Sequence, residues 1–400
     1  MSDITFAHRM SQIAPSPTLR VTAEADRLRR QGVDVVDLGA GEPDFATPEH
    51  VKAAAHTALD QNFTKYTPSA GIMELRQAVC ERYQTDYGVG FKPEEVIITA
   101  GGKQALYNTA MVLFDAGDEV ITHAPYWPTI PEQVKLAGAT PVVVQTHAED
   151  AFQVHADPLI AAITPRTKAI IINSPSNPAG ALISEAALGA IADAAATRGL
   201  WVILDLTYEK LLYDPIPHNL AKVLTDRMRD RAVLCGATSK AYAMTGWRCG
   251  WTIGPAKFIS ACNAVQGHST SNVASITQKA ALAALTGPQD CVGVMLAEYR
   301  VRRDRVHEWL TADRRMVCRK PQGAFYLFPY IADILEATGI RTSSEFAEAL
   351  LNESHVAVTA GEGFDAPGFF RLSYATSLER LREGVDRINA FVEKHSIAKV

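Results

Sequence analysis

A lysine and an arginine stand eight positions apart in the stretch TSKAYAMTGWRCG, residues 238–250. The surrounding residues are small or aromatic, which is too apolar a context for an ordinary solvated surface. Taken alone, Lys240 would be one more surface lysine. A buried lysine close to Arg248 would have a lowered pKa, however, and could act as a nucleophile or base, while an arginine can bind anionic groups. The pair predicts a reactive amine beside an anion-binding group.

Further polar residues follow apolar runs elsewhere in the chain. Gly101 and Gly102 come after VIIT, Asn177 lies in NSPSNPAG after AIII, and Asp205 ends WVILD. Each also has a purely structural interpretation: the glycines could form the turn into a helix, and Asp205 could cap a helix over LTYEKLL. In open parallel sheets, ligands bind at the carboxyl ends of the strands. We therefore expect these side chains to meet at one edge of a sheet.

Short β-branched runs alternate with helical patterns through the middle of the chain. Continuous apolar runs, rather than alternating ones, indicate strands that are covered on both faces. The stretch SEAALGAIADAAATRG, residues 184–199, predicts a helix that ends at Gly199. We expect an α/β fold in which helices wrap a mainly parallel sheet of about seven strands. The predicted strands are 96–99, 120–122, 142–145, 169–172, 202–204, 232–235 and 250–253.

The residue pattern changes after about residue 295, where AEYRVRRDRVHEWL predicts a long charged helix. GAFYLF and FFRLSYA are strand-like, and TAEADRLRRQG near the N-terminus is helical. A chain of 400 residues exceeds the size at which a single hydrophobic core stops growing. We expect a large domain at 45–295 and a smaller α+β domain built from both chain ends, 1–44 and 296–400.

Composition excludes several classes of protein. The chain is 47% hydrophobic and 21% charged, as in an ordinary globule, and its net charge of −5 argues against nucleic acid as a partner. Its apolar runs are too short to span a membrane. The six cysteines include no C-x-x-C pair, so we expect neither a disulfide framework nor a metal site. The N-terminus MSDITFAHRM has no signal-peptide core, which predicts a cytoplasmic protein.

The segment GAGEPDF, residues 39–45, invites a dinucleotide-binding interpretation that fails, because Asp44 stands where the third glycine is needed. The wider set of residues instead meets the needs of pyridoxal phosphate: an amine for its aldehyde, an acid for its pyridine nitrogen and a phosphate cradle. Lys240 would supply the amine and Asp205 the acid. Tyr208 and Asn177 could hydrogen-bond the ring hydroxyl. The predicted phosphate ligands are Gly101, Gly102, Ser239 and Arg248.

From about PSPT (15–18) to the last helix, the chain resembles class I aminotransferases of the fold-type I pyridoxal phosphate group. The motifs that carry the resemblance occur in one order: AGEPDF, KYTPSAG, GGKQALYN, PYW, NSPSNPAG, DLTY, SKAYAMTGWRCG and FRLSYA. Agreement by chance in so many ordered motifs is negligible. The resemblance implies the fold, the cofactor and an amino-group transfer that proceeds by ping-pong kinetics.

The resemblance also implies residue roles around the cofactor. Lys240 bonds to the cofactor aldehyde and, once freed, is the general base. Asp205 pairs with the pyridine nitrogen, and Asn177 and Tyr208 contact the phenolic oxygen. Tyr66 reaches the phosphate of a partner subunit, which implies a homodimer with shared active sites. Lys103 and Trp127 complete the predicted cofactor contacts, with the tryptophan near or over the ring; without these neighbours Trp127 would be read as a core aromatic.

Substrate binding is implied in the same way. Arg371 matches the arginine that grips the substrate α-carboxylate by a planar, paired contact, although an arginine in an apolar strand could also serve a buried ion pair. Gly41 lines the same pocket, together with Trp127 and Asn177. Lys103 binds the distal carboxylate in the bacterial aspartate aminotransferases that this chain most resembles; otherwise it is an exposed lysine at a helix start. Amino acids and 2-oxo acids, with aspartate and 2-oxoglutarate first, are the expected substrates.

Two departures and three alternatives accompany this prediction. Relatives that accept prephenate carry a basic residue before PSxT, where this chain has Ala14, and the usual DEIY is DLTY, with Leu206 in place of an acid. The alternatives are an aromatic or broad-specificity aminotransferase, a fold-type I C–S lyase and a silent cofactor-binding module in a regulator. The chain has no basic extension of the kind that a DNA-binding regulator would need.

Overall fold

The computed structural model describes residues 4–15 and 17–397 of the chain, so the outermost residues of the predicted small domain and Ser16 of the PSPT motif lie outside the described part. A seven-stranded sheet forms the centre of the larger part, in the order β2-β8-β7-β6-β5-β3-β4. Its strands are β2 (Val96–Thr99), β3 (Glu119–Ala124), β4 (Thr140–Gln145), β5 (Thr167–Asn173), β6 (Trp201–Asp205), β7 (Ala232–Ala237) and β8 (Gly250–Ile253). Every predicted strand is present, and the α/β fold is confirmed.

The sheet is mainly parallel, with one exception. Strand β8 runs antiparallel to both of its neighbours, β2 and β7, whereas the remaining pairs are parallel. Strands β2, β3, β5, β6 and β7 therefore all end at the same edge. Most of their residues are buried, because apolar clusters lie on both faces of the sheet, as the continuous apolar runs predict.

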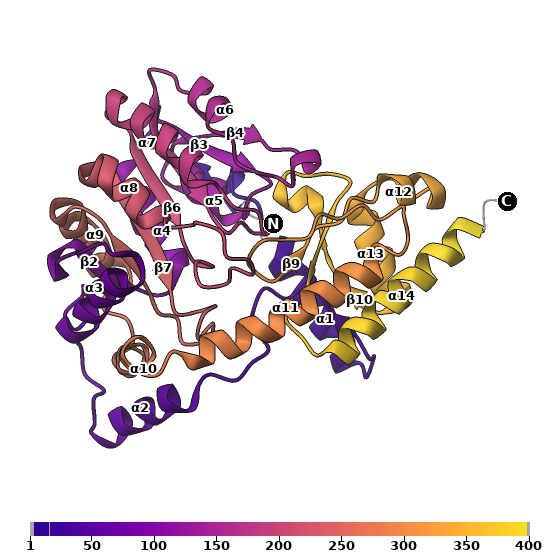
Figure 1. Ribbon diagram of the computed structural model, residues 1–400, viewed down its shortest axis with the longest axis horizontal. Coiled ribbons are helices and arrows are strands. Elements are labelled where there is room, and N and C mark those ends of the chain that lie inside the picture. The colour runs from indigo at the N-terminus through magenta and orange to yellow at the C-terminus, as the bar shows by residue number, and fades with distance from the viewer. Residues whose placement is uncertain (1–3, 16, 398–400) are drawn as a thin grey trace.

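Helices cover both faces of this sheet (Figure 1). The predicted helix at 184–199 is α7, which begins after the Ser184 cap and ends at Gly199 in the left-handed conformation. The helices of this part of the chain are α2 (Glu49–Asp60), α3 (Met73–Tyr87), α4 (Gly102–Leu113), α5 (Thr129–Leu136), α6 (Ala156–Ala161), α7 (Glu185–Arg198), α8 (Leu220–Met228), α9 (Ala256–Ser269) and α10 (Ser275–Thr286).

Segments from both ends of the chain form the second part of the structure at the right of Figure 1, where indigo α1 lies against strands near the yellow C-terminal helices. Strand β1 pairs in parallel with β10, and β12 lies between β11 and β9 in a three-stranded antiparallel sheet. The elements are α1 (Pro17–Arg30), β1 (Val36–Asp37), α11 (Asp290–Leu310), β9 (Tyr326–Leu327), α12 (Ala332–Thr338), α13 (Ser343–Ser354), β10 (Val356–Ala357), β11 (Thr359–Ala360), β12 (Phe370–Ser373) and α14 (Leu378–Ile397).

This separation of sheets agrees with the predicted small α+β layer from both chain ends, while the boundaries 1–44, 45–295 and 296–400 stay a prediction. The N-terminal arm also touches the larger part, because the backbone N–H of Ala14 donates to Glu132 in α5. Short 3-10 segments complete the fold: η1 (His8–Ser11), η2 (Pro93–Glu95), η3 (Ala148–Asp150), η4 (Arg229–Arg231) and η5 (Gly361–Phe364).

The possible helix over LTYEKLL is wrong. Residues 206–211 form consecutive turns, with hydrogen bonds from Glu209 N–H to the Leu206 carbonyl and from Leu211 N–H to the Tyr208 carbonyl. The helix does not propagate because Leu212 forms an antiparallel bridge with Gly323, far away in the sequence. A tertiary contact therefore overrides the local helical pattern.

No single helix in the described residues has both the length and the apolar character needed to cross a bilayer. The pair α10 and α11, which meet at a bend of 80°, would meet that requirement together on length and composition alone.

Candidate active site

A cavity of about 430 Å³ opens where the carboxyl ends of the parallel strands face the small sheets. Asn173 and Asp205 are the last residues of β5 and β6, and Lys240 lies just beyond β7. Gly102 begins α4 after β2, and Trp127 follows β3. The residues lining the cavity are Thr22, Ala40, Gly41, Glu42, Gly102, Lys103, Trp127, Asn173, Asn177, Asp205, Thr207, Tyr208, Ser239, Lys240, Thr245, Arg248, Tyr326 and Arg371.

The side chain of Lys240 faces this cavity, and its Nζ donates to the carbonyl of Gly41. Loss of solvation lowers the pKa of Lys240 to about 7; Glu42 opposes this shift, and the cations Arg371 and Arg248 add to it. At neutral pH a large fraction of this amine is therefore unprotonated, the form that a nucleophile or general base requires.

Asp205 is buried at the floor of the cavity. Its Oδ1 accepts hydrogen bonds from Thr207 N–H at 3.1 Å and Thr207 Oγ1 at 2.6 Å, an arrangement confined to the turn after β6. Burial raises the pKa of Asp205, while the Thr207 bonds and nearby Lys240 oppose the rise. Among the described residues, no lysine or arginine forms an ion pair with this carboxylate. A cationic ligand atom would stabilise its ionised form.

An anion-binding corner forms at the start of α4. Gly101 has φ 79°, and a Cβ there would lie 2.7 Å from Arg248 Nη2, so only glycine allows the guanidinium to pack this closely. Arg248 donates to the carbonyls of Ala100 and Thr245, each at 3.0 Å, and has no carboxylate partner among the described residues. Its charge, the N-terminus of α4 and Ser239 all border the cavity, as a phosphate site requires.

Arg371 lies at the opposite side of the cavity on β12 and is 1% exposed. Its Nη1 donates to Asn177 Oδ1 at 2.9 Å and its Nη2 to the Gly39 carbonyl at 2.7 Å. Its guanidinium lies 4.4 Å from the centroid of the Tyr326 ring. The buried ion pair considered as an alternative is absent: within the described part of the chain this arginine has no carboxylate partner. A buried, unneutralised guanidinium is suited to an anionic ligand.

Tyr208 and Tyr326 join the two sides of the cavity. Their hydroxyl groups share a hydrogen bond of 2.7 Å, and burial raises the pKa of both. Tyr326 also limits the space beside Gly41, where a Cβ would lie 3.1 Å from the tyrosine hydroxyl. Both phenols therefore stay protonated in the neutral range and can donate a hydrogen bond.

Lys103 lies in the first turn of α4, with its Nζ 5.1 Å from the centroid of the Trp127 ring. Desolvation and the nearby Arg248 charge lower its pKa. The backbone carbonyl of Lys103 accepts a hydrogen bond from Gln133 Nε2 at 2.9 Å, which fixes the helix start against α5. No carboxylate among the described residues forms an ion pair with this ammonium, so it remains available to a ligand.

Eleven of the predicted site residues line the cavity, and two do not. Gly101 lies directly behind it, under Arg248, and Tyr66 is 91% exposed and separate from it. Seven lining residues were not among the predicted site residues. Five of them stand inside recognised motifs, whereas nothing local marks Tyr326. The full missed set is Thr22, Ala40, Glu42, Asn173, Thr207, Thr245 and Tyr326.

The cavity fits pyridoxal phosphate on its own chemistry. A reactive amine, a buried carboxylate that lacks a cation and an anion-binding helix start surround one space. Together with the seven-stranded sheet, these features define a pyridoxal-phosphate-dependent transferase of fold type I. In the described residues no three histidine, cysteine or acidic side chains are grouped as metal ligands would be.

The chain belongs to the aminotransferase class I and II family, whose model matches residues 33–388. It is 44% identical to the aspartate aminotransferase of Geobacillus stearothermophilus over 97% of this chain and 99% of the relative. It is 43% identical to the aspartate/prephenate aminotransferase of Cereibacter sphaeroides, with 96% and 97% covered. The structure of Thermus thermophilus aspartate aminotransferase with maleate is similar with a TM-score of 0.91, at 43% identity over 97% of this chain and 100% of that one.

Proposed function

We propose that this chain moves the amino group of aspartate to 2-oxoglutarate with pyridoxal phosphate as cofactor. The observation that carries the proposal is the convergence of Lys240, Asp205 and Arg371 on one cavity, with the lysine pKa lowered to about 7. Relatives at 43% identity or more over nearly the whole chain are named aspartate aminotransferases. Amino acids and 2-oxo acids are thus the substrates that fit the site.

The cofactor would be held by residues from both sides of the cavity. Arg248, Ser239 and the backbone N–H groups at the start of α4 (Gly102, Lys103) would bind its phosphate. Asp205 would hold the pyridine nitrogen, and Tyr208 and Asn177 the ring hydroxyl. Trp127 would cover the ring. Bound in this way, pyridoxal phosphate supplies an aldehyde for amines and a ring that accepts electrons from the substrate α-carbon.

The residues of the chain account for the proton transfers. With a pKa of about 7, Lys240 Nζ can take the α-proton of the substrate and return a proton at a neighbouring carbon. Asp205, ionised beside a cationic nitrogen, would keep that nitrogen protonated. Arg371 would hold the α-carboxylate by a paired contact, with Asn177 fixing one guanidinium nitrogen. The two half-reactions use the same site, so the kinetics should be ping-pong.

Selection of a dicarboxylic substrate would depend on Lys103. Its ammonium has no carboxylate partner in the described residues and borders the same cavity as Arg371. Two cations on one cavity suit an amino acid with two carboxylates. The cation also opposes the helix dipole at the start of α4, so an anion beside it would relieve an unfavourable interaction.

Steady-state turnover of four amino donors with 2-oxoglutarate tests the proposal. Aspartate should give the highest kcat/KM, ahead of glutamate, phenylalanine and alanine, and single donors should convert the yellow enzyme to the amine form of the cofactor. Aspartate as the poorest donor would favour the aromatic or broad-specificity aminotransferase. Pyruvate and ammonia released from a cysteine conjugate, without accumulation of the amine form, would favour the C–S lyase.

A homodimer is part of the proposal. Tyr66 is 91% exposed, and the proposed role of its hydroxyl is to reach the cofactor phosphate of a second copy. Light scattering should give twice the chain mass, and Tyr66→Phe should weaken cofactor binding without changing that mass. A cytoplasmic location is proposed as well, in keeping with six cysteines that are all free.

Prephenate is a second acceptor to test, because the Cereibacter relative is named for both substrates. Ala14 lacks the basic side chain expected of such enzymes, and its N–H is held by Glu132. Turnover of prephenate should therefore be much slower than turnover of oxaloacetate, and Ala14→Lys is the variant expected to raise it.

A further inference from the structure

Two backbone carbonyls of one short segment contact the cations of the site. The carbonyl of Gly39 accepts from Arg371 Nη2 at 2.7 Å, and that of Gly41 accepts from Lys240 Nζ. The direction of the peptide after Gly39 therefore decides where one of the two terminal guanidinium nitrogens lies. Asn177 fixes only the other one, Nη1.

The backbone just before Gly39 is fixed by strand pairing. Leu38 donates its N–H to the Ala357 carbonyl at 2.9 Å and accepts from Ser373 N–H at 2.7 Å. Gly39 itself donates to no backbone carbonyl of the described residues; its N–H donates instead to Asp37 Oδ1 at 2.9 Å. The Asp37 side chain thus takes the place of a strand carbonyl as the acceptor for the N–H of Gly39, as in an Asx turn. Gly39 is also the residue whose carbonyl accepts from Arg371.

The Asp37 carboxylate is itself held in place. Its side chain is 12% exposed, and Oδ2 accepts from Arg29 Nη2 of α1 at 3.0 Å. Space beside Gly39 is tight, since a Cβ there would lie 3.1 Å from Val21 Cγ1 and 3.5 Å from Asp37 Oδ1. The carboxylate therefore holds the N–H of Gly39 in place, within the same residue whose carbonyl accepts from Arg371.

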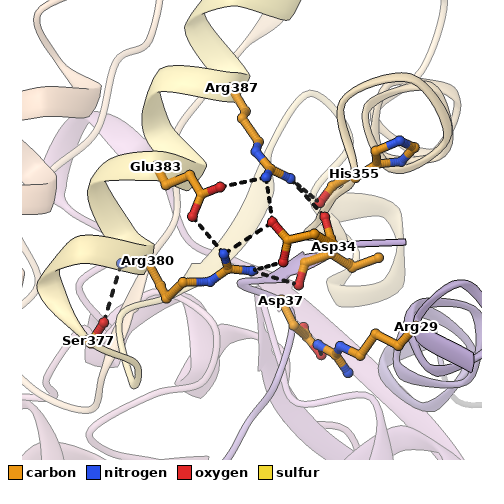
Figure 2. A network of polar contacts seen from close by, with 9 residues as sticks. Arg29, Asp34, Asp37, His355, Ser377, Arg380, Glu383 and Arg387 are labelled. Carbon is orange, nitrogen blue, oxygen red and sulfur yellow. Dashed lines mark hydrogen bonds and ion pairs between the residues drawn. The ribbon is translucent and has the colours of Figure 1, made fainter. Parts of the chain in front are cut away.

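A neighbouring ionic cluster anchors the same segment without touching the site (Figure 2). Asp34 pairs with Arg380 at 2.9 Å and Arg387 at 2.7 Å, both of which also pair with Glu383 on α14. The Asp34 side chain is 63% exposed, and none of its contacts involves Gly39. This cluster offers a matched control for effects on stability alone.

We propose that Asp37 is a positioning residue for Arg371: through the turn at Gly39 it sets the guanidinium in the orientation that receives the substrate carboxylate. The inference rests on the proposed function of Arg371 as the carboxylate-binding group. Without the carboxylate, the N–H of Gly39 loses its acceptor, and the turn that presents the Gly39 carbonyl to Arg371 Nη2 is held only by the strand bonds of Leu38. Binding should then weaken for every substrate, whatever its side chain, because all share the α-carboxylate.

Calorimetric titration of the holoenzyme with maleate, a dicarboxylate that cannot react, measures this effect. Asp37→Ala should raise the Kd about 5-fold, the equivalent of one hydrogen bond, and should raise the KM of aspartate and phenylalanine by the same factor with little change in kcat. Asp37→Asn keeps an oxygen acceptor for Gly39 N–H and should stay near the wild-type Kd. Arg29→Met, which releases Oδ2, should fall between them, and it tests the inference if the alanine variant fails to fold.

The controls separate positioning from general stability. Asp34→Ala should lower the melting temperature and leave the Kd unchanged, and Asp26→Ala, which removes the other ion pair of Arg29, should behave like the wild type. In an Arg371→Lys background, Asp37→Ala should cause no further loss.

Two results would overturn this inference but leave the proposed function standing. One is a wild-type Kd for maleate in Asp37→Ala, and the other is a full 5-fold loss caused by Asp37→Ala in the Arg371→Lys background. A wild-type holoenzyme that neither binds maleate nor transfers an amino group would overturn the proposed function and this inference with it.

Discussion

The hydroxyl groups of Tyr208 and Tyr326 are 2.7 Å apart, although the two residues are separated by 118 positions in the chain. One follows strand β6 of the large sheet and the other lies on β9 of the small sheet. Their hydrogen bond is a direct polar link across the cavity between the proposed cofactor side and the proposed substrate side. Both side chains are buried, and both line the cavity.

Removal of one hydroxyl from this pair should therefore destabilise the folded protein. Tyr326→Phe removes the partner of the Tyr208 hydroxyl and should lower the free energy of unfolding by about 0.5–1.5 kcal/mol, the net contribution of one hydrogen bond. The double variant Tyr208→Phe/Tyr326→Phe should be more stable than the sum of the single changes predicts. Urea denaturation of the four proteins measures this coupling, and purely additive losses would contradict it.

Loss of the reactive amine should remove both colour and turnover. Lys240→Ala should abolish the visible absorbance of the lysine-linked cofactor and lower kcat by at least about 10²–10⁴-fold, the usual contribution of a general base. The fold should persist, because the side chain faces a cavity. Lys222→Ala, which removes an exposed lysine paired with Asp226, is the control and should keep both properties. Full turnover in Lys240→Ala would refute the assignment.

The lowered pKa of Lys240 predicts how capture of the cofactor depends on pH. The attacking amine must be unprotonated, so the rate at which cofactor-free protein takes up pyridoxal phosphate should rise with pH up to about 7 and then level off. Stopped-flow absorbance between pH 5.5 and 9.5 records this rate. An ordinary lysine would instead show a rate that keeps rising about tenfold per pH unit up to about pH 10.

The two proposed carboxylate-binding cations should differ in their effects. Lys103→Ala should lower kcat/KM for aspartate and glutamate by about tenfold or more while leaving phenylalanine and alanine nearly unchanged, because only the dicarboxylates lose a charge-assisted contact. Arg371→Lys should weaken all four, since a lysine cannot reproduce the paired contact. Equal losses of kcat/KM for all four donors in Lys103→Ala would contradict the proposal that Lys103 binds the distal carboxylate.

A buried acid outside the cavity should make stability depend on pH. Burial raises the pKa of Glu209 to about 7, and within the described part of the chain its Oε2 has no hydrogen-bond partner. Because the folded pKa lies above the unfolded value, the folded protein binds the extra proton and this acid destabilises it increasingly from about pH 4.5 to pH 7. Glu209→Gln should therefore raise the melting temperature more at pH 8 than at pH 5. Exposed Glu348→Gln is the control.

Local sequence was sufficient for the strands that carry the site. Apolar runs such as VIIT and AIII are buried on both faces, and the polar residues that follow them do meet at one edge of the sheet, as the rule for parallel sheets requires. Lys240 and Asp205 were found in this way because Asp205 ends one strand and Lys240 comes shortly after another. Their identity as reactive groups came from residue type, which needs no tertiary information.

Pairing between segments that are far apart in the sequence determined the features of the site that local sequence did not predict. The predicted helix after Asp205 is replaced by turns because Leu212 bridges to Gly323, and no pattern near residue 206 reveals that partner. Tyr326 joins the site only because β9 pairs with β12.

By itself, therefore, the sequence determined which chemical groups the protein carries and which strands present them, since both depend on residue type and short-range pattern. Only the tertiary structure decided how these groups are oriented, that Arg371 is buried without a carboxylate among the described residues, and that its guanidinium donates to the carbonyl of Gly39. The orientation of Arg371 depends on Gly39 and Asn177, which are 332 and 194 positions away in the sequence, and chain-local preferences carry no information about such contacts.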